Sequence, residues 1–265
     1  MTGWLAPESL GEVLALRSEH SDATVLAGGT FVGILMNQGL LQPQTLLSLG
    51  RVDGIDHVEV VDGELRLGPM ATHRAVERSA AVRAGWPVLA RAFSLVASPR
   101  VRNQATVGGV LADADYASDP PAVLTALGAR VLLRSASGER SVGIDQLIRG
   151  HYETCIAGDE LLVEVRVPPC PERAVYRKFR SRSSEDRPCV AVAAARGEGA
   201  PRVVVGAVAG RPQEFPELCA NGGSPAEIGA AYAERIDPIS DARGSAGYRR
   251  RVIAVEVRRA LEELG

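Results

Sequence analysis

Val25-Leu26-Ala27-Gly28-Gly29-Thr30 and Thr106-Val107-Gly108-Gly109 carry most of the information in this chain. Each places a glycine pair beside a threonine, next to an apolar run that reads as a β-strand. Glycine has no Cβ, so its backbone can approach a ligand closely with several N–H groups pointing outward together. Two such places in one domain indicate a clamp around a polyanion such as a pyrophosphate.

Each stretch taken alone also has a purely structural explanation, because glycine turns between strands and helices are common for steric reasons. The functional alternative for the first stretch is that N–H groups at the start of the following helix hold a phosphate, with the Thr30 hydroxyl adding a hydrogen bond. The same two alternatives stay open for the second stretch.

Composition excludes several classes of protein. The 265 residues are 46% hydrophobic and 23% charged, and the net charge of −2 gives no global attraction to nucleic acid or a membrane. No apolar run approaches the roughly 20 residues that span a bilayer, and residues 1–10 do not resemble a signal peptide. The four cysteines lack metal-binding spacing, so we expect a reduced, cytoplasmic chain without a metal site.

The order of apolar patterns indicates an α+β protein. A strand–helix–strand unit is expected at the front, with strands at 24–27 and 45–49. A hairpin around Asp62-Gly63 and a strand at 161–167 follow. Pro168 to Glu172 is the predicted domain boundary. Beyond it we expect a small antiparallel meander with strands at 175–179, 189–195 and 203–208, and then two helices.

Three further sets of polar residues invite a functional interpretation. Ser118 and Asp119 precede a helix that starts at Pro120, so they either cap it or bind a polar ligand. Lys178, the only lysine, lies among arginines in a predicted strand that is either a solvated edge or an anion site. A cation there could also stabilise a reduced flavin. The four histidines are scattered, which favours surface or capping roles, and no common phosphate-binding or catalytic motif is present.

The whole pattern resembles the FAD-binding medium subunit of molybdenum hydroxylases, the carbon monoxide dehydrogenase and xanthine dehydrogenase type of flavoprotein. The first glycine stretch and residues 98–109 are similar to the two flavin-pyrophosphate loops of that family. Residues 117–120 are similar to the acidic segment that follows, and residues 241–250 to the start of the C-terminal helix. The resemblance covers nearly the full length.

The resemblance implies a two-subdomain PCMH-type FAD-binding domain at 1–168, divided into 1–52 and 53–168, and a small C-terminal α+β domain at 169–265. It implies no catalytic acid or base, because the cofactor carries the chemistry. The FAD-binding residues that it implies are Val25, Leu26, Ala27, Gly28, Gly29, Thr30, Ala105, Thr106, Gly108, Gly109, Ala112, Ser118, Asp119, Leu162 and Lys178.

The chain departs from the family pattern at several positions near these residues. The usual asparagine after the second glycine pair is Val110, a common histidine is Asp113, and a common proline is Tyr116. Val110 lacks the hydrogen bonds of an asparagine side chain, so FAD affinity or pose is expected to differ. Arg187-Pro188 is unusual in a segment that faces the flavin in relatives.

The function that the resemblance implies is electron transfer from a partner iron–sulfur subunit, fed by a molybdopterin subunit, through FAD to a small-molecule or protein acceptor. The chain has neither an iron–sulfur motif nor room for a molybdopterin domain, so partners would supply both. The departures leave two alternatives open. One is a stand-alone FAD-dependent oxidase or dehydrogenase, and the other is a flavin-free structural or binding subunit.

Overall fold

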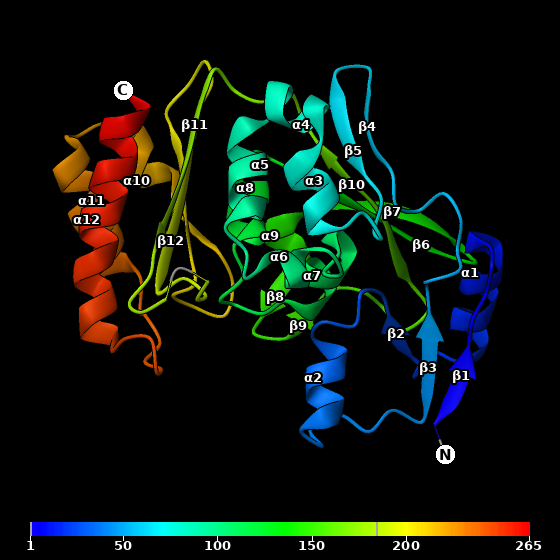
Figure 1. Ribbon diagram of the computed structural model, residues 1–265. Coiled ribbons are helices and arrows are strands. Elements are labelled where there is room, and N and C mark those ends of the chain that lie inside the picture. Colours follow the sequence, from blue (N-terminus) through cyan, green and yellow to red (C-terminus); the bar gives the residue numbers. More distant parts are fainter. Residues whose placement is uncertain (1, 184) are drawn as a thin grey trace.

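The first part of the chain forms a small parallel sheet in the order β1-β3-β2 (Figure 1). This computed structural model describes residues 2–183 and 185–265. Strands β2 (Thr24–Leu26) and β3 (Thr45–Ser48) pair in parallel and are joined through α2 (Val32–Asn37), which confirms the predicted strand–helix–strand unit. Helix α1 (Leu10–Glu19) precedes β2, and β1 (Gly3–Leu5) is a third strand that was not predicted.

The second part is built on a five-stranded antiparallel sheet in the order β4-β5-β10-β6-β7. Asp62 and Gly63 have φ angles of 54° and 80°, which makes the connection a tight hairpin and confirms that prediction. The strands are β4 (Val58–Val61), β5 (Glu64–Leu67), β6 (Arg130–Ser135), β7 (Gly138–Gly143) and β10 (Leu161–Val167), with a separate pair β8 (Ile148–Gly150) and β9 (Glu153–Thr154).

Short helices cover this sheet and share its largest hydrophobic core. Thr72 caps the first of them, its hydroxyl accepting from the N–H of Ala75 at 3.1 Å. The helices are α3 (His73–Arg78), α4 (Ala80–Gly85), α5 (Pro87–Ser94), α6 (Pro99–Arg102), α7 (Val107–Asp113), α8 (Pro120–Ala126) and α9 (Ile144–Leu147).

The expectation of a strand beside the second glycine pair is wrong, because this stretch begins helix α7. The Thr106 hydroxyl accepts a hydrogen bond from the N–H of Gly109 at 3.0 Å, which is the geometry of a helix N-cap. The apolar run that suggested a strand instead buries Val107 and Leu111, four residues apart on one helical face.

The third part is a four-stranded antiparallel sheet with helices on one face, as predicted. Along β12, Val190, Val192 and Ala194 pack in the core under the C-terminal helices, whereas Ala191 and Ala193 pack in the core of the second part. The elements are β11 (Arg173–Phe179), β12 (Val190–Arg196), β13 (Arg202–Gly206), β14 (Gln213–Glu214), α10 (Pro216–Ala220), α11 (Pro225–Arg235) and α12 (Ala246–Leu264).

The α+β class is confirmed by this arrangement. The predicted boundary at residue 168 falls between β10 and β11, where sheet membership changes. Division into domains 1–168 and 169–265 stays a prediction, since the third part shares a core with the second. Within the described residues, no helix is both long and apolar enough to cross a bilayer.

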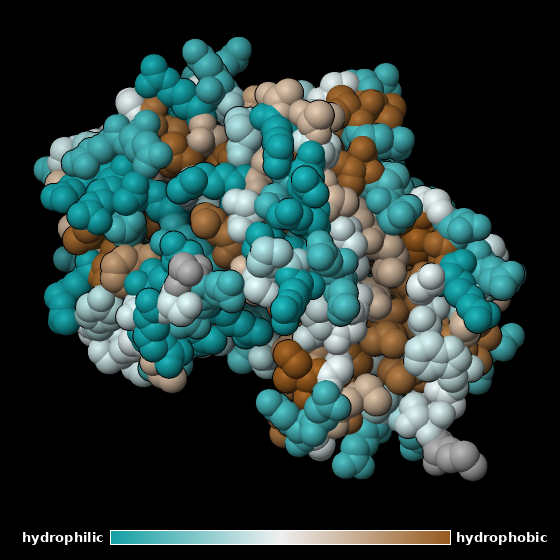
Figure 2. All heavy atoms as spheres, viewed as in Figure 1, coloured by the Kyte–Doolittle hydropathy of each residue, from teal (hydrophilic) through white to brown (hydrophobic). Residues whose placement is uncertain are grey.

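Helix α2 is only partly covered by the rest of the protein, and none of its residues is buried. On the face shown in Figure 2, hydrophobic atoms gather around this helix and beside it, whereas hydrophilic atoms cover most of the side that carries α10 to α12. Ile34, in α2, is 52% exposed. A helix with apolar side chains that remain uncovered is typical of one wall of a ligand cavity.

Candidate functional site

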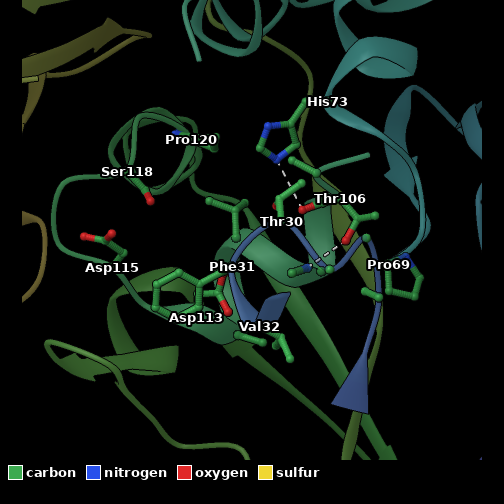
Figure 3. A pocket seen from close by; sticks show the side chains of 18 of the residues that line it. Thr30, Phe31, Val32, Pro69, His73, Thr106, Asp113, Asp115, Ser118 and Pro120 are labelled. Carbon is green, nitrogen blue, oxygen red and sulfur yellow. Dashed lines mark hydrogen bonds between the residues drawn. The ribbon is translucent and has the colours of Figure 1, made fainter. Parts of the chain in front are cut away.

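A cavity of about 390 Å³ lies where the two glycine stretches meet (Figure 3). Of the predicted site residues, Leu26 does not line it; this residue ends β2, and its carbonyl accepts from the N–H of Leu49 at 2.9 Å. The predicted residues that do line the cavity are Val25, Ala27, Gly28, Gly29, Thr30, Ala105, Thr106, Gly108, Gly109, Ala112, Ser118, Asp119, Leu162 and Lys178.

The first glycine loop is held against the second by close backbone contact. A Cβ on Gly28 would lie 1.7 Å from the carbonyl oxygen of Gln104, so a side chain at this position would push the loops apart. Gly29 has a φ of +70°, which favours glycine. Within residues 2–183 and 185–265, no protein group accepts from the N–H of Gly28, Gly29 or Thr30. These donors therefore remain available to a ligand.

The second glycine loop uses its N–H groups inside the protein. The N–H of Val107 donates to the carbonyl of Ala71 and that of Gly108 to the carbonyl of Pro69, both at 2.9 Å, while Gly109 donates to Thr106. A Cβ on Gly108 would lie 2.8 Å from the Cβ of Pro69. We expected the N–H groups of both pairs to hold a phosphate, whereas those of the second pair serve packing and capping.

Asp119 and Lys178 form a buried ion pair at the cavity wall. Lys178 Nζ lies 2.9 Å from Asp119 Oδ2 and donates to the carbonyl of Leu95 at 2.8 Å. Tyr176 donates to Asp119 Oδ1 at 2.5 Å. Asp119 makes no side-chain capping bond to α8, so the capping alternative fails for this residue. Burial raises the pKa of Asp119 and lowers that of Lys178, because desolvation disfavours both charges.

His73 and Arg17 also line the cavity, and neither was among the predicted site residues. The expectation of a surface role is wrong for His73, which is buried. His73 Nε2 lies 3.2 Å from the carbonyl of Thr106, so it carries the proton and fixes the tautomer. Burial lowers the pKa of His73 to about 4, which keeps the ring neutral. Arg17 of α1 is 6% exposed and donates to the carbonyl of Ala23 at 2.9 Å. Neither residue lies in a sequence motif that would indicate a binding site.

A third group of charges stands at the end of α7. Arg187 forms an ion pair with Asp115 and lines the cavity, as its place in the family pattern suggested. Asp113 points into the same cavity near Phe31 (Figure 3). Burial and the neighbouring Asp115 raise the pKa of Asp113 to about 7, against the opposing effect of Arg187.

Geometry and charge together suit a ligand that is partly apolar and partly phosphorylated. Phe31, Val32 and Ile34 supply an apolar wall, and the free N–H groups of the first loop supply phosphate donors. These features fit a flavin dinucleotide. The site is therefore that of a flavoprotein whose cofactor cavity lies between two glycine loops. No group of three or more potential metal ligands occurs among the described residues.

Residues 1–170 match the model of the FAD binding domain in molybdopterin dehydrogenase, and the chain belongs to this family. It is 34% identical over 273 residues to the nicotine 6-hydroxylase medium subunit of Paenarthrobacter nicotinovorans, covering 99% of this chain and 96% of the relative. It is 29% identical to the carbon monoxide dehydrogenase medium chain of Hydrogenophaga pseudoflava, covering 97% and 94%.

Solved structures agree with this assignment. Quinoline 2-oxidoreductase from Pseudomonas putida 86 superposes with a TM-score of 0.91 at 28% identity, covering 100% of this chain and 96% of that one. Carbon monoxide dehydrogenase from Hydrogenophaga pseudoflava gives 0.92 at 28% identity, covering 99% and 96%. The chain is therefore an FAD-binding, FAD-dependent oxidoreductase chain of the medium-subunit type. FAD binding contradicts the flavin-free alternative.

Proposed function

We propose that this chain passes electrons from a partner iron–sulfur subunit through FAD to an external acceptor, as part of a complex that also contains a molybdopterin subunit. The observation that carries the proposal is similarity along almost the whole chain to proteins named as medium subunits, medium chains or, at 31% identity, as a subunit of a dehydrogenase complex. FAD supplies the electron-carrying chemistry when it is bound.

The residues of this chain would bind and orient the cofactor. The N–H groups of Gly28, Gly29 and Thr30 would hold the pyrophosphate, because no described residue accepts a hydrogen bond from them. The second loop would act indirectly, since Gly108 and Thr106 fix the wall against which the first loop packs. We expect no residue of the chain to act as a catalytic acid or base.

Lys178 would act on the flavin as a fixed charge. Its ammonium group is held by Asp119 and the carbonyl of Leu95 at the cavity wall, so its position costs no reorganisation when charge develops nearby. Asp119 would thus position Lys178, rather than contact the ligand through its own engaged oxygens. Ser118, Ala112 and Leu162 would complete the lining.

A partner must supply the cluster in this scheme. The four cysteines are unpaired and are not grouped with other potential metal ligands in the described part of the chain. An electron that reaches this chain from iron and sulfur therefore has to cross a subunit interface.

Purification of the tagged chain from its native host tests the proposal. We expect a visible flavin spectrum with stoichiometric FAD, together with co-purified iron and molybdenum measured by elemental analysis. Flavin reduction by the substrate of the complex should be lost when the partners are removed. A chain that purifies alone with FAD and turns over a small molecule with oxygen would instead establish the stand-alone flavoenzyme.

A further inference from the structure

The acidic side chains that line the cavity differ in whether they form an ion pair with a cation. Four of them line it, and three have a cation. Asp115 pairs with Arg187, Asp119 pairs with Lys178, and Glu160 pairs with Arg140 at 2.6 Å. Asp113 has no ion pair and no hydrogen bond with any described residue. Among the described residues, its carboxyl group is thus the acid of the cavity without an ion pair, and Arg187 acts on it only through its electrostatic field.

The position of Asp113 in the fold makes a negative charge there unfavourable for two further reasons. It is the last residue of α7, where the helix dipole presents its negative end. Asp115 follows two residues later and lines the same cavity. Asp113 is half-buried, so solvent screens these interactions only in part.

A pyrophosphate is a dianion that would enter this same cavity. The free N–H groups of Gly28, Gly29 and Thr30 favour it, whereas a carboxylate at Asp113 would repel it. Val110, at the other end of this turn of α7, offers no donor that could offset the repulsion. Protonated Asp113 removes the repulsion and offers an O–H donor instead.

We propose that Asp113 is protonated when FAD occupies the cavity, so that FAD affinity falls as the pH rises. This inference rests on the FAD-binding function and makes Asp113 a determinant of cofactor affinity. Burial and Asp115 raise the pKa of Asp113 to about 7, so the protonation state of this carboxyl group changes near neutral pH. The other charged groups that face it are Arg187, from the connection between β11 and β12, and the phenol of Tyr152, from the turn between β8 and β9.

FAD titrations of the apoprotein between pH 6 and 9 test the proposal. Above pH 7 the Kd of the wild-type chain should rise by roughly tenfold per pH unit, because one proton must be taken up on binding. Asp113→Asn should show a flat profile and should bind more tightly than the wild type at pH 9. Asp56→Asn, which removes an exposed carboxylate outside the cavity, should behave as the wild type.

Calorimetry in two buffers of different ionisation enthalpy gives a second readout. We expect uptake of close to one proton by the wild type above pH 7 and none by Asp113→Asn. A pH-independent Kd, or weaker binding by Asp113→Asn at every pH, would overturn the inference, because the latter means that the carboxylate accepts from a hydroxyl of FAD. Absence of FAD binding at any pH would overturn the FAD-binding function itself.

Discussion

The two glycine loops meet at one cavity and carry the same pair of residues beside a threonine, but they differ in what their N–H groups do. In the first loop, Gly28 and Gly29 donate to no described protein group, and both are half-buried. In the second, Gly108 and Gly109 donate to Pro69 and Thr106. The contrast teaches that the same motif can serve a ligand in one place and the protein's own packing in another.

Loss of Lys178, at the cavity wall, should have the largest effect. Lys178→Met leaves the buried carboxyl group of Asp119 without its cation, which should cost about 3–5 kcal/mol of unfolding free energy. Urea denaturation of the apoprotein measures this loss. The double variant Lys178→Met/Asp119→Asn should recover much of it. Equal stability of the single variant and the wild type would contradict the buried pair.

Acid should lower the free energy of unfolding, because protonation of the buried His73 beside the second loop is unfavourable in the folded chain. The pKa of about 4 in the folded chain lies below the ordinary value of 6.5, so the unfolded chain binds the proton more tightly. The stabilisation is complete above pH 6.5 and should fall by about 3 kcal/mol as the pH drops toward 4. Denaturation at several pH values should show a shallower acid slope for His73→Gln than for the wild type. His20→Gln, outside the cavity, is the matched control.

Separation of the two loops should affect both stability and ligand binding. Gly28→Ala places a methyl group against the carbonyl of Gln104 and should destabilise the apoprotein by about 3 kcal/mol. FAD affinity should fall as well, because the first loop moves. Gly33→Ala, in α2 with no atom within 4 Å of the added Cβ, should change unfolding by less than about 1 kcal/mol. Similar behaviour of the two variants would show that the loops do not depend on close contact.

The two threonines give the smallest and most selective test. Thr106→Val removes a helix cap and should cost about 1 kcal/mol of unfolding free energy. Thr30→Val removes a hydroxyl that has no hydrogen bond with the described residues, so stability should change by less than about 0.5 kcal/mol. FAD affinity of Thr30→Val should instead fall roughly three- to tenfold. If Thr30→Val lost stability and Thr106→Val lost only FAD affinity, the roles assigned to the two loops would be reversed.

Local features of the sequence were enough to predict much of the fold. Strand β10 was predicted at its observed bounds, because an alternating apolar run ends at Pro168-Pro169. The buried stripe of α12 contains Ile253, Val257 and Leu261, whose spacing in the sequence is that of one helical face. These patterns involve neighbours in sequence, and short-range physics decides them.

Other features depend on contacts that a pattern along the chain does not contain. Gly28 meets Gln104 across a long sequence separation, and this contact, rather than an approach to the ligand, excludes its side chain. Arg17 joins the cavity because α1 packs beside it. Ser118, Asp119 and Lys178, which the family pattern implied as FAD-binding residues, line one cavity, but only the structure reveals that Asp119 and Lys178 bind each other.

The alternation of side chains along β12 has a consequence for how the chain folds. Ala191 and Ala193 cover the core beneath α8, while Val190 and Val192 complete the core beneath α12. One strand thus belongs to two hydrophobic cores. If either core unfolds, the strand is lost and the other core becomes exposed to solvent. A chain that ends at Val167 would lack the β12 residues that cover its larger hydrophobic core. We therefore expect that the flavin-binding part does not fold on its own and that the whole chain unfolds in a single cooperative step.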